Sequence, residues 1–178
     1  MTSLLAVTAL VALTAGERLV ELVLSRLNAA WSLRRGGVEY GRGHYPLMVA
    51  LHAGFLVAVL AEAWLRRPDV SPTLAWSMLV LVLAAQALRW WCIAALGPRW
   101  NTRVIVIPGM APVTNGPYRW LRHPNYVAVV VEGVALPLFH ACWVTALAFT
   151  VANAVLLATR IRVEDAALAS LPRRTVDA

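Results

Sequence analysis

Five apolar runs that are almost free of charge constrain this chain more than any other feature of its sequence. They cover about residues 4–24, 46–64, 74–96, 126–139 and 141–159. A helix needs roughly 20 consecutive apolar residues to cross the hydrocarbon core of a bilayer, and most of the runs come near that length. The runs therefore predict an all-α integral membrane protein with about five transmembrane helices.

The composition indicates the same class. The 178 residues are 60% hydrophobic and 14% charged, with a mean hydropathy of +0.67. A soluble domain is usually about 45–50% apolar and about 25% charged. We expect one membrane domain over 1–178, with three spans over 1–96 and a loop, a helical hairpin and a C-terminal helix over 97–168. The first run lacks a basic n-region, which favours a retained span over a cleaved signal peptide.

The last two apolar runs predict the hairpin. The run at 126–139 is too short for a comfortable crossing by itself, and His140 separates it from the run at 141–159. We expect two antiparallel helices with Pro137 near their bend. The segment 160–168 is amphipathic and is expected to be helical, followed by a frayed tail.

The basic residues predict an orientation. The net charge is +7, the sequence contains no Lys, and Arg residues gather in the connections between the apolar runs. The positive-inside rule explains this pattern better than nucleic-acid binding does. We therefore expect a multi-pass protein of the inner membrane with its N-terminus outside, its long loop and C-terminal segment in the cytosol, and no nucleic-acid partner. Arg89, beside Trp90-Trp91, is interpreted as an interfacial anchor.

The cysteines and the histidines of the second run do not predict a metal site. Cys92 and Cys142 lie in apolar helical sequence, as small core residues do. His44, Met48 and His52 recur every four residues, so they share a helix face. Two His residues with no carboxylate or thiol between them make a poor ligand set, which favours hydrogen bonding or substrate contact.

The second half of the first run carries an unusual set of polar side chains. These residues fall on or next to one helix face and are Glu17, Arg18, Glu21, Ser25 and Asn28. Ionisable groups within a span usually face the bundle interior or a cavity. Two interpretations stay open at this point: an Arg18–Glu21 pair that locks the helix, or a polar wall of a substrate cavity.

The longest loop, about 99–125, is the richest in chemistry. Its first part, 103–109, is β-branched and ends in a Pro-Gly turn, which predicts a short strand-like or irregular segment. Its second part, 114–126, mixes turn residues with aromatic and basic side chains, and Pro124 is suited to begin a helix. A polar loop of this kind between membrane helices indicates a binding site. It is expected on the same side of the membrane as Arg160 and Glu164, so the two regions can meet.

Two motifs resemble the isoprenylcysteine carboxyl methyltransferase family of membrane methyltransferases. They read Gly116-Pro117-Tyr118-x-x-x-Arg122-His123-Pro124-Asn125-Tyr126 and Arg160-x-x-x-Glu164-Asp165-x-x-Leu168. The N-terminal features are similar to a bacterial branch that includes O-methyltransferases of long-chain alkylpyrones or alkylresorcinols. These features are Glu17-Arg18-Leu19-x-Glu21, Ser25, Asn28, Glu39, Gly41, His44-Tyr45 and His52.

The resemblance implies S-adenosylmethionine as cofactor and S-adenosylhomocysteine as product. The residues that would contact it are Met110, Ala111, Pro112, Val113, Tyr118, His123, Pro124, Asn125, Tyr126 and Glu164. Aromatic faces suit the adenine and the sulfonium, amides at a helix start suit the carboxylate, and Glu164 suits the ammonium. No metal is implied.

The acceptor implied by the resemblance is a lipophilic small molecule that arrives from the membrane lipids. Arg160 takes the place of the substrate-orienting arginine, and further substrate contacts are expected from Glu17, Glu21, His44 and His52. A carboxylate or acidic enol arrives ionised, whereas a phenol needs a base, for which Glu132, His52 and Glu21 are candidates. An isoprenylcysteine-type carboxylate is the alternative acceptor.

A different class also stays open, namely a membrane scaffold or a small transporter. Arg160 and Glu164 could form an ordinary surface pair, and Tyr118 could be an interfacial belt residue. The sequence shows no internal repeat of the kind that transporters carry. The oligomeric state is not predicted.

Overall fold

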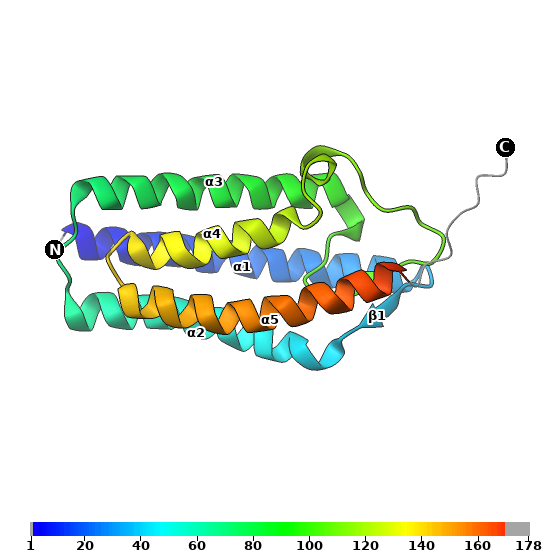
Figure 1. Ribbon diagram of the computed structural model, residues 1–178, viewed down its shortest axis with the longest axis horizontal. Coiled ribbons are helices and arrows are strands. Elements are labelled where there is room, and N and C mark those ends of the chain that lie inside the picture. The colour runs from blue at the N-terminus through cyan, green and yellow to red at the C-terminus, as the bar shows by residue number, and fades with distance from the viewer. Residues whose placement is uncertain (1, 170–178) are drawn as a thin grey trace.

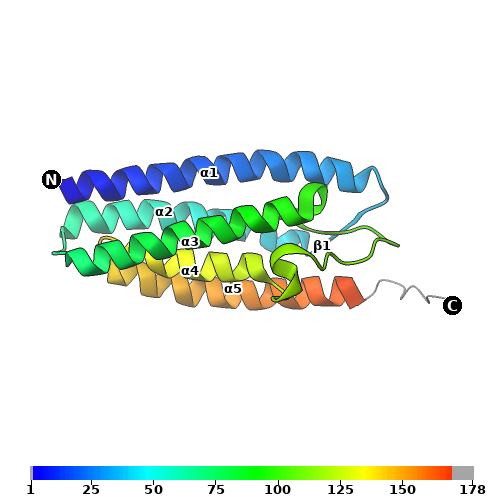
Figure 2. The same ribbon diagram turned by 90° about the horizontal axis from the view of Figure 1, so that it is seen from above.

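The chain folds into a bundle of helices that lie alongside one another. The computed structural model describes residues 2–169. The helices are α1 (Thr2–Leu33), α2 (Tyr45–Arg66), α3 (Pro72–Leu96), α4 (Pro124–Leu138) and α5 (Trp143–Ala169). Figures 1 and 2 show these helices side by side from two directions. The prediction of an all-α membrane protein is confirmed.

The helices differ in length. All but α4 are long and apolar enough to cross a bilayer. At 1.5 Å per residue, the 15 residues of α4 span about 22 Å, less than the roughly 30 Å of a hydrocarbon core. The prediction of about five crossings therefore stays a prediction, because α4 lies within the bundle without reaching the length of its neighbours (Figure 1).

The two ends of the bundle have different characters. The N-terminus and the short α2–α3 and α4–α5 turns gather at one end (Figure 1). The long loop, the end of α5 and a small sheet gather at the other. In this sheet β1 (Val38–Tyr40) pairs antiparallel with β2 (Val104–Val106), with Glu39 opposite Ile105. The predicted strand-like segment is confirmed as β2, whereas β1 was not predicted.

The predicted hairpin of α4 and α5 is confirmed. Its turn closes through the Pro137 carbonyl, which accepts hydrogen bonds from the backbone N–H groups of His140 (3.1 Å) and Cys142 (3.0 Å). Glu62 of α2 caps the start of α5, because its carboxylate accepts from the Thr145 N–H at 2.7 Å. The segment 160–168 is the last part of α5 and not a separate helix, and the expected frayed tail lies outside the described residues.

The first span was predicted to end near Leu24, and that boundary is wrong. Helix α1 continues to Leu33, and the chain leaves it at Gly36, which has a positive φ of 78°. The helix can continue because no Gly or Pro interrupts residues 17–35 and because polar residues there bond to other elements. Asn28, for example, donates to the Trp100 carbonyl at 2.8 Å. Hydropathy marks where a helix is apolar, not where it stops.

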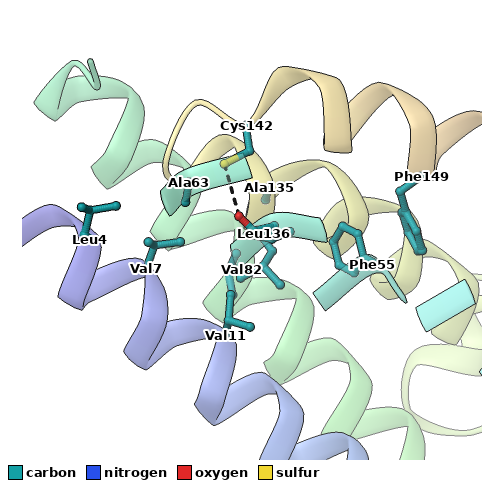
Figure 3. Close-up of a cluster of buried hydrophobic side chains, with 11 residues drawn as sticks. Leu4, Val7, Val11, Phe55, Ala63, Val82, Ala135, Leu136, Cys142 and Phe149 are labelled. Carbon is teal, nitrogen blue, oxygen red and sulfur yellow. Dashed lines mark hydrogen bonds between the residues drawn. The ribbon is translucent and has the colours of Figure 1, made fainter. Parts of the chain in front are cut away.

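The hydrophobic core occupies the end of the bundle near the N-terminus. Its buried members come from every helix and are Leu4, Val7, Val11, Phe55, Val59, Ala63, Val82, Ala135, Leu136, Cys142 and Phe149 (Figure 3). Both cysteines are reduced and buried, which agrees with the interpretation of small core residues. Because this end is filled by apolar side chains, the cavities lie toward the other end.

Candidate active site

A cavity of about 400 Å³ opens at the end that carries the long loop, and we call it the polar cavity because Arg99, His123 and Glu164 are among its lining residues. Its walls come from the loop, from the start of α4 and from the last turns of α5. The loop is held over it by Arg99, whose Nη1 donates to the Ala111 carbonyl at 2.7 Å. This bond holds residues 110–113 in place, and these residues line the cavity.

The glycine-proline turn explains how the aromatic part of the loop is placed. Gly116 has a positive φ of 56°, and a Cβ there would lie 2.9 Å from the Cβ of Ala95 on α3. Only glycine permits both this conformation and this close approach. The 3₁₀ turn Gly116–Arg119 therefore packs on the end of α3 and brings Tyr118 to the cavity wall. Burial raises the pKa of the Tyr118 phenol above its ordinary value, so the phenol is neutral at physiological pH.

The loop and α5 meet across this cavity, as predicted. The Tyr126 hydroxyl donates to Glu164 and accepts from Arg160 Nε at 2.9 Å. His123 stacks on Tyr126 with ring centroids 5.4 Å apart. His123 Nε2 lies 3.3 Å from a carboxylate oxygen of Asp165, but the geometry is not that of a hydrogen bond, and both atoms are buried without a hydrogen-bond partner among the described residues.

A second cavity of about 300 Å³ lies deeper in the bundle and is mostly apolar. Its walls come mainly from α1, α2, α4 and α5, with Leu22, Leu56 and Leu156 among the apolar side chains. The two cavities share five lining residues, which are Trp100, Asn101, Asn125, Tyr126 and Arg160. They therefore adjoin at the hydrogen-bonded pair of Tyr126 and Arg160.

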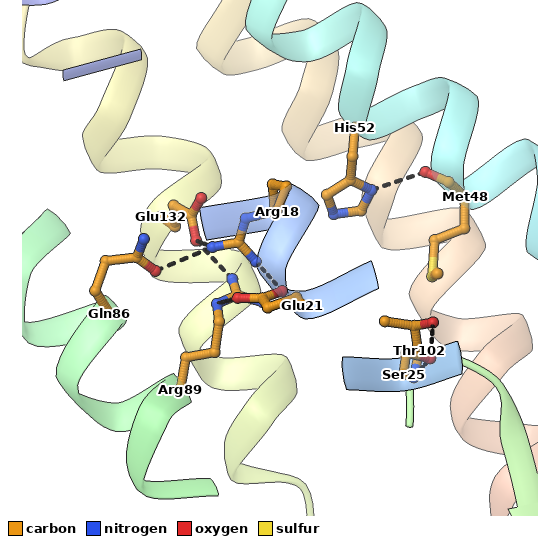
Figure 4. Close-up of polar contacts among 9 residues, drawn as sticks. All are labelled: Arg18, Glu21, Ser25, Met48, His52, Gln86, Arg89, Thr102 and Glu132. Carbon is orange, nitrogen blue, oxygen red and sulfur yellow. Dashed lines mark hydrogen bonds and ion pairs between the residues drawn. The ribbon is translucent and has the colours of Figure 1, made fainter. Parts of the chain in front are cut away.

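A cluster of buried charges borders the apolar cavity. We call it the ion cluster, and its members are Arg18 and Glu21 of α1, Gln86 and Arg89 of α3, and Glu132 of α4 (Figure 4). Arg18 contacts Glu21 at 2.7 Å, and Glu132 accepts from Arg18 at 3.0 Å and from Arg89 at 2.5 Å. The predicted Arg18–Glu21 pair is therefore confirmed. Both residues also line the apolar cavity, and its role as a substrate cavity stays a prediction.

Comparisons with known proteins identify the family. The model of the isoprenylcysteine carboxyl methyltransferase (ICMT) family matches residues 78–170, just over half of the chain. This chain belongs to the ICMT family. The match covers most of α3, the whole long loop, α4 and α5.

Relatives extend the ICMT similarity over most of the chain. An uncharacterized protein of Bacillus subtilis, YpbQ, is 37% identical over 160 residues, which is 89% of this chain and 94% of that protein. An uncharacterized protein of Haemophilus influenzae is 26% identical over 140 residues, 78% of this chain and 81% of that one. No solved structure matches. The ICMT domain implies a membrane methyltransferase, and these relatives say nothing of its acceptor.

The structure brings together most of the residues expected to contact the ICMT cofactor. All of them except Pro124 line the polar cavity. Pro124 is buried at the first position of α4, where its ring is compatible with a helix start. Their roles stay predictions.

The expected acceptor and base residues are more widely placed. Arg160 lines both cavities, and Glu21 and His52 line the apolar one. Glu132 lines neither cavity but bonds to Arg18 and Arg89, which do line the apolar one. Glu17 and His44 line neither, since Glu17 lies beside the ion cluster on α1 and His44 lies in the short turn Arg42–His44 before α2.

Sequence reasoning misplaced Arg89 and did not single out several cavity residues. Arg89 is not an interfacial anchor, because only 5% of it is exposed and it is bound to Glu132. Gln86 lies one turn before it on the same face, and this polar pair within an apolar run was the signal for an interior position. Asn101 also lines both cavities, and nothing in its local sequence indicates this. Asn153 lines the apolar cavity, and its spacing of seven residues from Arg160 puts it on the same face of α5.

Proposed function

We propose that this protein is an S-adenosylmethionine-dependent O-methyltransferase that acts on a lipophilic acceptor in the inner membrane. The polar cavity would hold the cofactor and the apolar cavity the acceptor. The observation that carries the proposal is the junction of the two cavities at Tyr126 and Arg160. Two reactants placed on either side of this junction would meet in the orientation that methyl transfer requires.

The residues of the polar cavity fit the cofactor. Its volume of about 400 Å³ lies within the range of small-molecule sites, roughly 300–1,000 Å³. Glu164 offers a carboxylate to an ammonium, and the rings of Tyr118 and Tyr126 offer faces to an adenine or a sulfonium. His123 Nε2 and Asn125 Oδ1 are buried without a hydrogen-bond partner among the described residues. Such atoms normally find one, which supports a polar ligand here.

The chain's own residues would align the acceptor and neutralise its charge. When bound, the cofactor supplies a methyl group on a sulfonium, a good leaving group. Arg160 would hold the acceptor oxygen as an anion, and its own position is fixed by Tyr126 and by the Met48 sulfur, 2.7 Å from Nη1. The apolar walls would exclude water, which strengthens this charge interaction.

A protic acceptor such as an enol or a phenol also needs a base, and the contacts favour His52 among the three candidates. His52 Nδ1 lies 2.9 Å from the Met48 carbonyl oxygen (Figure 4). A carbonyl can only accept, so Nδ1 carries the proton and Nε2 keeps a lone pair. The carboxylates of Glu21 and Glu132 are each engaged in ion pairs with arginines of the ion cluster.

We favour a long-chain alkylpyrone or alkylresorcinol as acceptor over an isoprenylcysteine-type carboxylate. The acceptor would enter the apolar cavity sideways from the lipid, and the cofactor would enter from the cytosol. Supporting this route, the long loop that lines the polar cavity lies at the end of the bundle opposite the N-terminus (Figure 1), and the distribution of Arg predicts that the N-terminus is outside.

The first prediction tests the cofactor site. Purified protein in detergent should bind S-adenosylhomocysteine, and Glu164→Gln should weaken that binding by roughly 10- to 100-fold, because a charged hydrogen bond contributes about 1.5–3 kcal/mol. Isothermal titration calorimetry gives both dissociation constants. Asp69→Asn, in the α2–α3 turn at the other end of the bundle, is the control and should bind like the wild type.

Transfer itself is tested with a labelled methyl donor. Membranes that contain the protein are given alkylresorcinol, alkylpyrone and farnesylcysteine acceptors, and the labelled lipids are identified. Label on the resorcinol or pyrone is expected. Label on farnesylcysteine alone would show that the acceptor is an isoprenylcysteine-type carboxylate. In the binding experiment, no binding of S-adenosylhomocysteine at millimolar concentration would favour a membrane scaffold.

A further inference from the structure

The ion cluster is the largest feature of the bundle that the methyl-transfer chemistry leaves unused. It places two guanidiniums and two carboxylates inside a membrane protein, on three different helices. Glu21 is 4% exposed and Arg89 is 5% exposed. Buried ion pairs are weak contributors to stability because desolvation opposes their attraction, and ionisable groups within a membrane usually serve a function.

Part of the hydrogen-bonding capacity of the cluster is unfilled. Arg18 Nε, Arg89 Nε and Glu21 Oε1 are buried and have no hydrogen-bond partner among residues 2–169. Arg89 Nε and Glu21 Oε1 are 3.6 Å apart, too far for a hydrogen bond. Two donors and one acceptor are therefore left over, on side chains that all line the apolar cavity.

The charge of the cluster limits the kind of group that could fill this capacity. Arg18 and Arg89 are balanced by Glu21 and Glu132, so the formal net charge is zero. An anion would gain from the arginines but would be opposed by Glu21, which lines the same cavity. A neutral hydroxyl both donates to a carboxylate and accepts from a guanidinium, so it suits the unfilled atoms.

No member of the ion cluster is among the five residues that line both cavities. Figure 4 shows Arg18, Glu21 and Arg89 together, with His52 beside Arg18 and Met48 farther away. Met48 in turn contacts Arg160 through its sulfur. The apolar cavity thus has one polar region at Arg160 and a second at the ion cluster.

We propose that the ion cluster is a second polar subsite of the acceptor cavity and binds a neutral hydroxyl of the acceptor while another oxygen lies at Arg160. This inference rests on the proposed function and names its substrate class, a lipid whose head carries two oxygen functions. The subsite selects against lipids with one oxygen, because they would leave the buried polar atoms unfilled.

The test compares two acceptors that differ by one hydroxyl, namely a resorcinol and a phenol that carry the same alkyl chain. Their binding to the full-length wild-type protein with S-adenosylhomocysteine is measured in detergent by equilibrium dialysis, so that no transfer is required. We expect the resorcinol to bind at least about tenfold more tightly, the gain expected of one hydrogen bond to a charged group. Equal binding, or binding of neither lipid, would overturn the subsite.

Variants assign the preference to the cluster. Glu21→Gln removes the charge at nearly constant shape and should reduce the preference to less than about threefold. Glu62→Gln, which removes a carboxylate of α2 far from the cavity, should leave the preference unchanged. S-adenosylhomocysteine binding by Glu21→Gln shows that its cofactor cavity is folded. A Glu21→Gln protein that binds this ligand and keeps the full preference would refute the assignment.

The two proposals can fail separately. If neither lipid is methylated but the resorcinol preference is present and depends on Glu21, the proposed function is wrong and the subsite stands. If both lipids are methylated and bind equally, the proposed function stands and the subsite is wrong.

Discussion

At the scale of single residues, burial distinguishes the charged side chains that form strong contacts inside the bundle from those at its surface. Arg66 contacts Glu62 at 3.4 Å on an exposed surface, where such a pair contributes little. Arg89 contacts Glu132 at 2.5 Å with almost no access to solvent. Both arginines lie in or near apolar runs, and only Arg89 has a polar neighbour, Gln86, one turn away on the same helix face.

The burial of the ion cluster leads to a stability prediction. Glu132→Leu should destabilise the protein by about 3–5 kcal/mol, because it leaves Arg18 and Arg89 with one carboxylate between them. A thermal unfolding midpoint in detergent measures the loss. Val130→Leu, at an exposed position of the same helix, is the control and should change the midpoint little. An unchanged midpoint for Glu132→Leu would mean that the cluster is hydrated.

At the scale of elements, the close packing of α4 on α5 depends on a single glycine. A Cβ at Gly133 would lie 2.4 Å from a ring carbon of Phe149. That ring cannot move aside easily, since it packs on Phe55 with centroids 4.1 Å apart and on His52 at 5.4 Å. The hairpin is therefore coupled through Phe149 to His52, which lines the apolar cavity.

This packing predicts opposite signs for two Gly-to-Ala changes. Gly54→Ala, within α2 and with nothing near the new Cβ, should stabilise the protein by about 0.5–1 kcal/mol. Gly133→Ala should destabilise it by about 1–3 kcal/mol, because the overpacking exceeds the gain in helix propensity. Thermal midpoints of both variants give the comparison, and a stabilised Gly133→Ala would show that α4 and α5 can separate.

At the scale of the whole molecule, the bundle is divided between a filled end and an open end. The apolar core occupies the end with the N-terminus and the short turns (Figure 3). The cavities lie toward the long loop and the small sheet (Figures 1 and 2). Under the proposed function, the cavity at the open end would hold the cofactor and the adjoining apolar cavity would hold the lipid.

Membrane orientation is the corresponding prediction. Asp69→Cys, in the α2–α3 turn, should react with a membrane-impermeant maleimide that is applied to spheroplasts, whose inner membrane is intact. Thr114→Cys, in the long loop, should react only after lysis, since the Arg-rich connections are expected inside. The wild type is the control, because its two cysteines are buried. The reverse pattern of labelling would show that the orientation is inverted and that the polar cavity faces the outside.

The sequence by itself determined the class of fold and the approximate helices, and through the family resemblance it indicated many of the residues that line the polar cavity. Apolar run length reports membrane helices directly, and Gly116-Pro117 and Pro124 mark turns and a helix start through local sterics. These signals are local, so they can be read without knowing which segments meet. The same locality explains the error at the end of α1, since a polar segment can remain helical when other elements satisfy it.

Only the tertiary structure decided the pairings that define the cavities. Arg18 and Glu132 are 114 residues apart, and their contact has no local signature. The strand β1, the pairing of Arg89 with Glu132 and the second cavity likewise have no local signature in the sequence. They arise because helices from distant parts of the chain pack together, and which polar side chains then face each other depends on helix rotation and length. The sequence indicated the candidate residues, but it did not show that they are divided between two adjoining cavities.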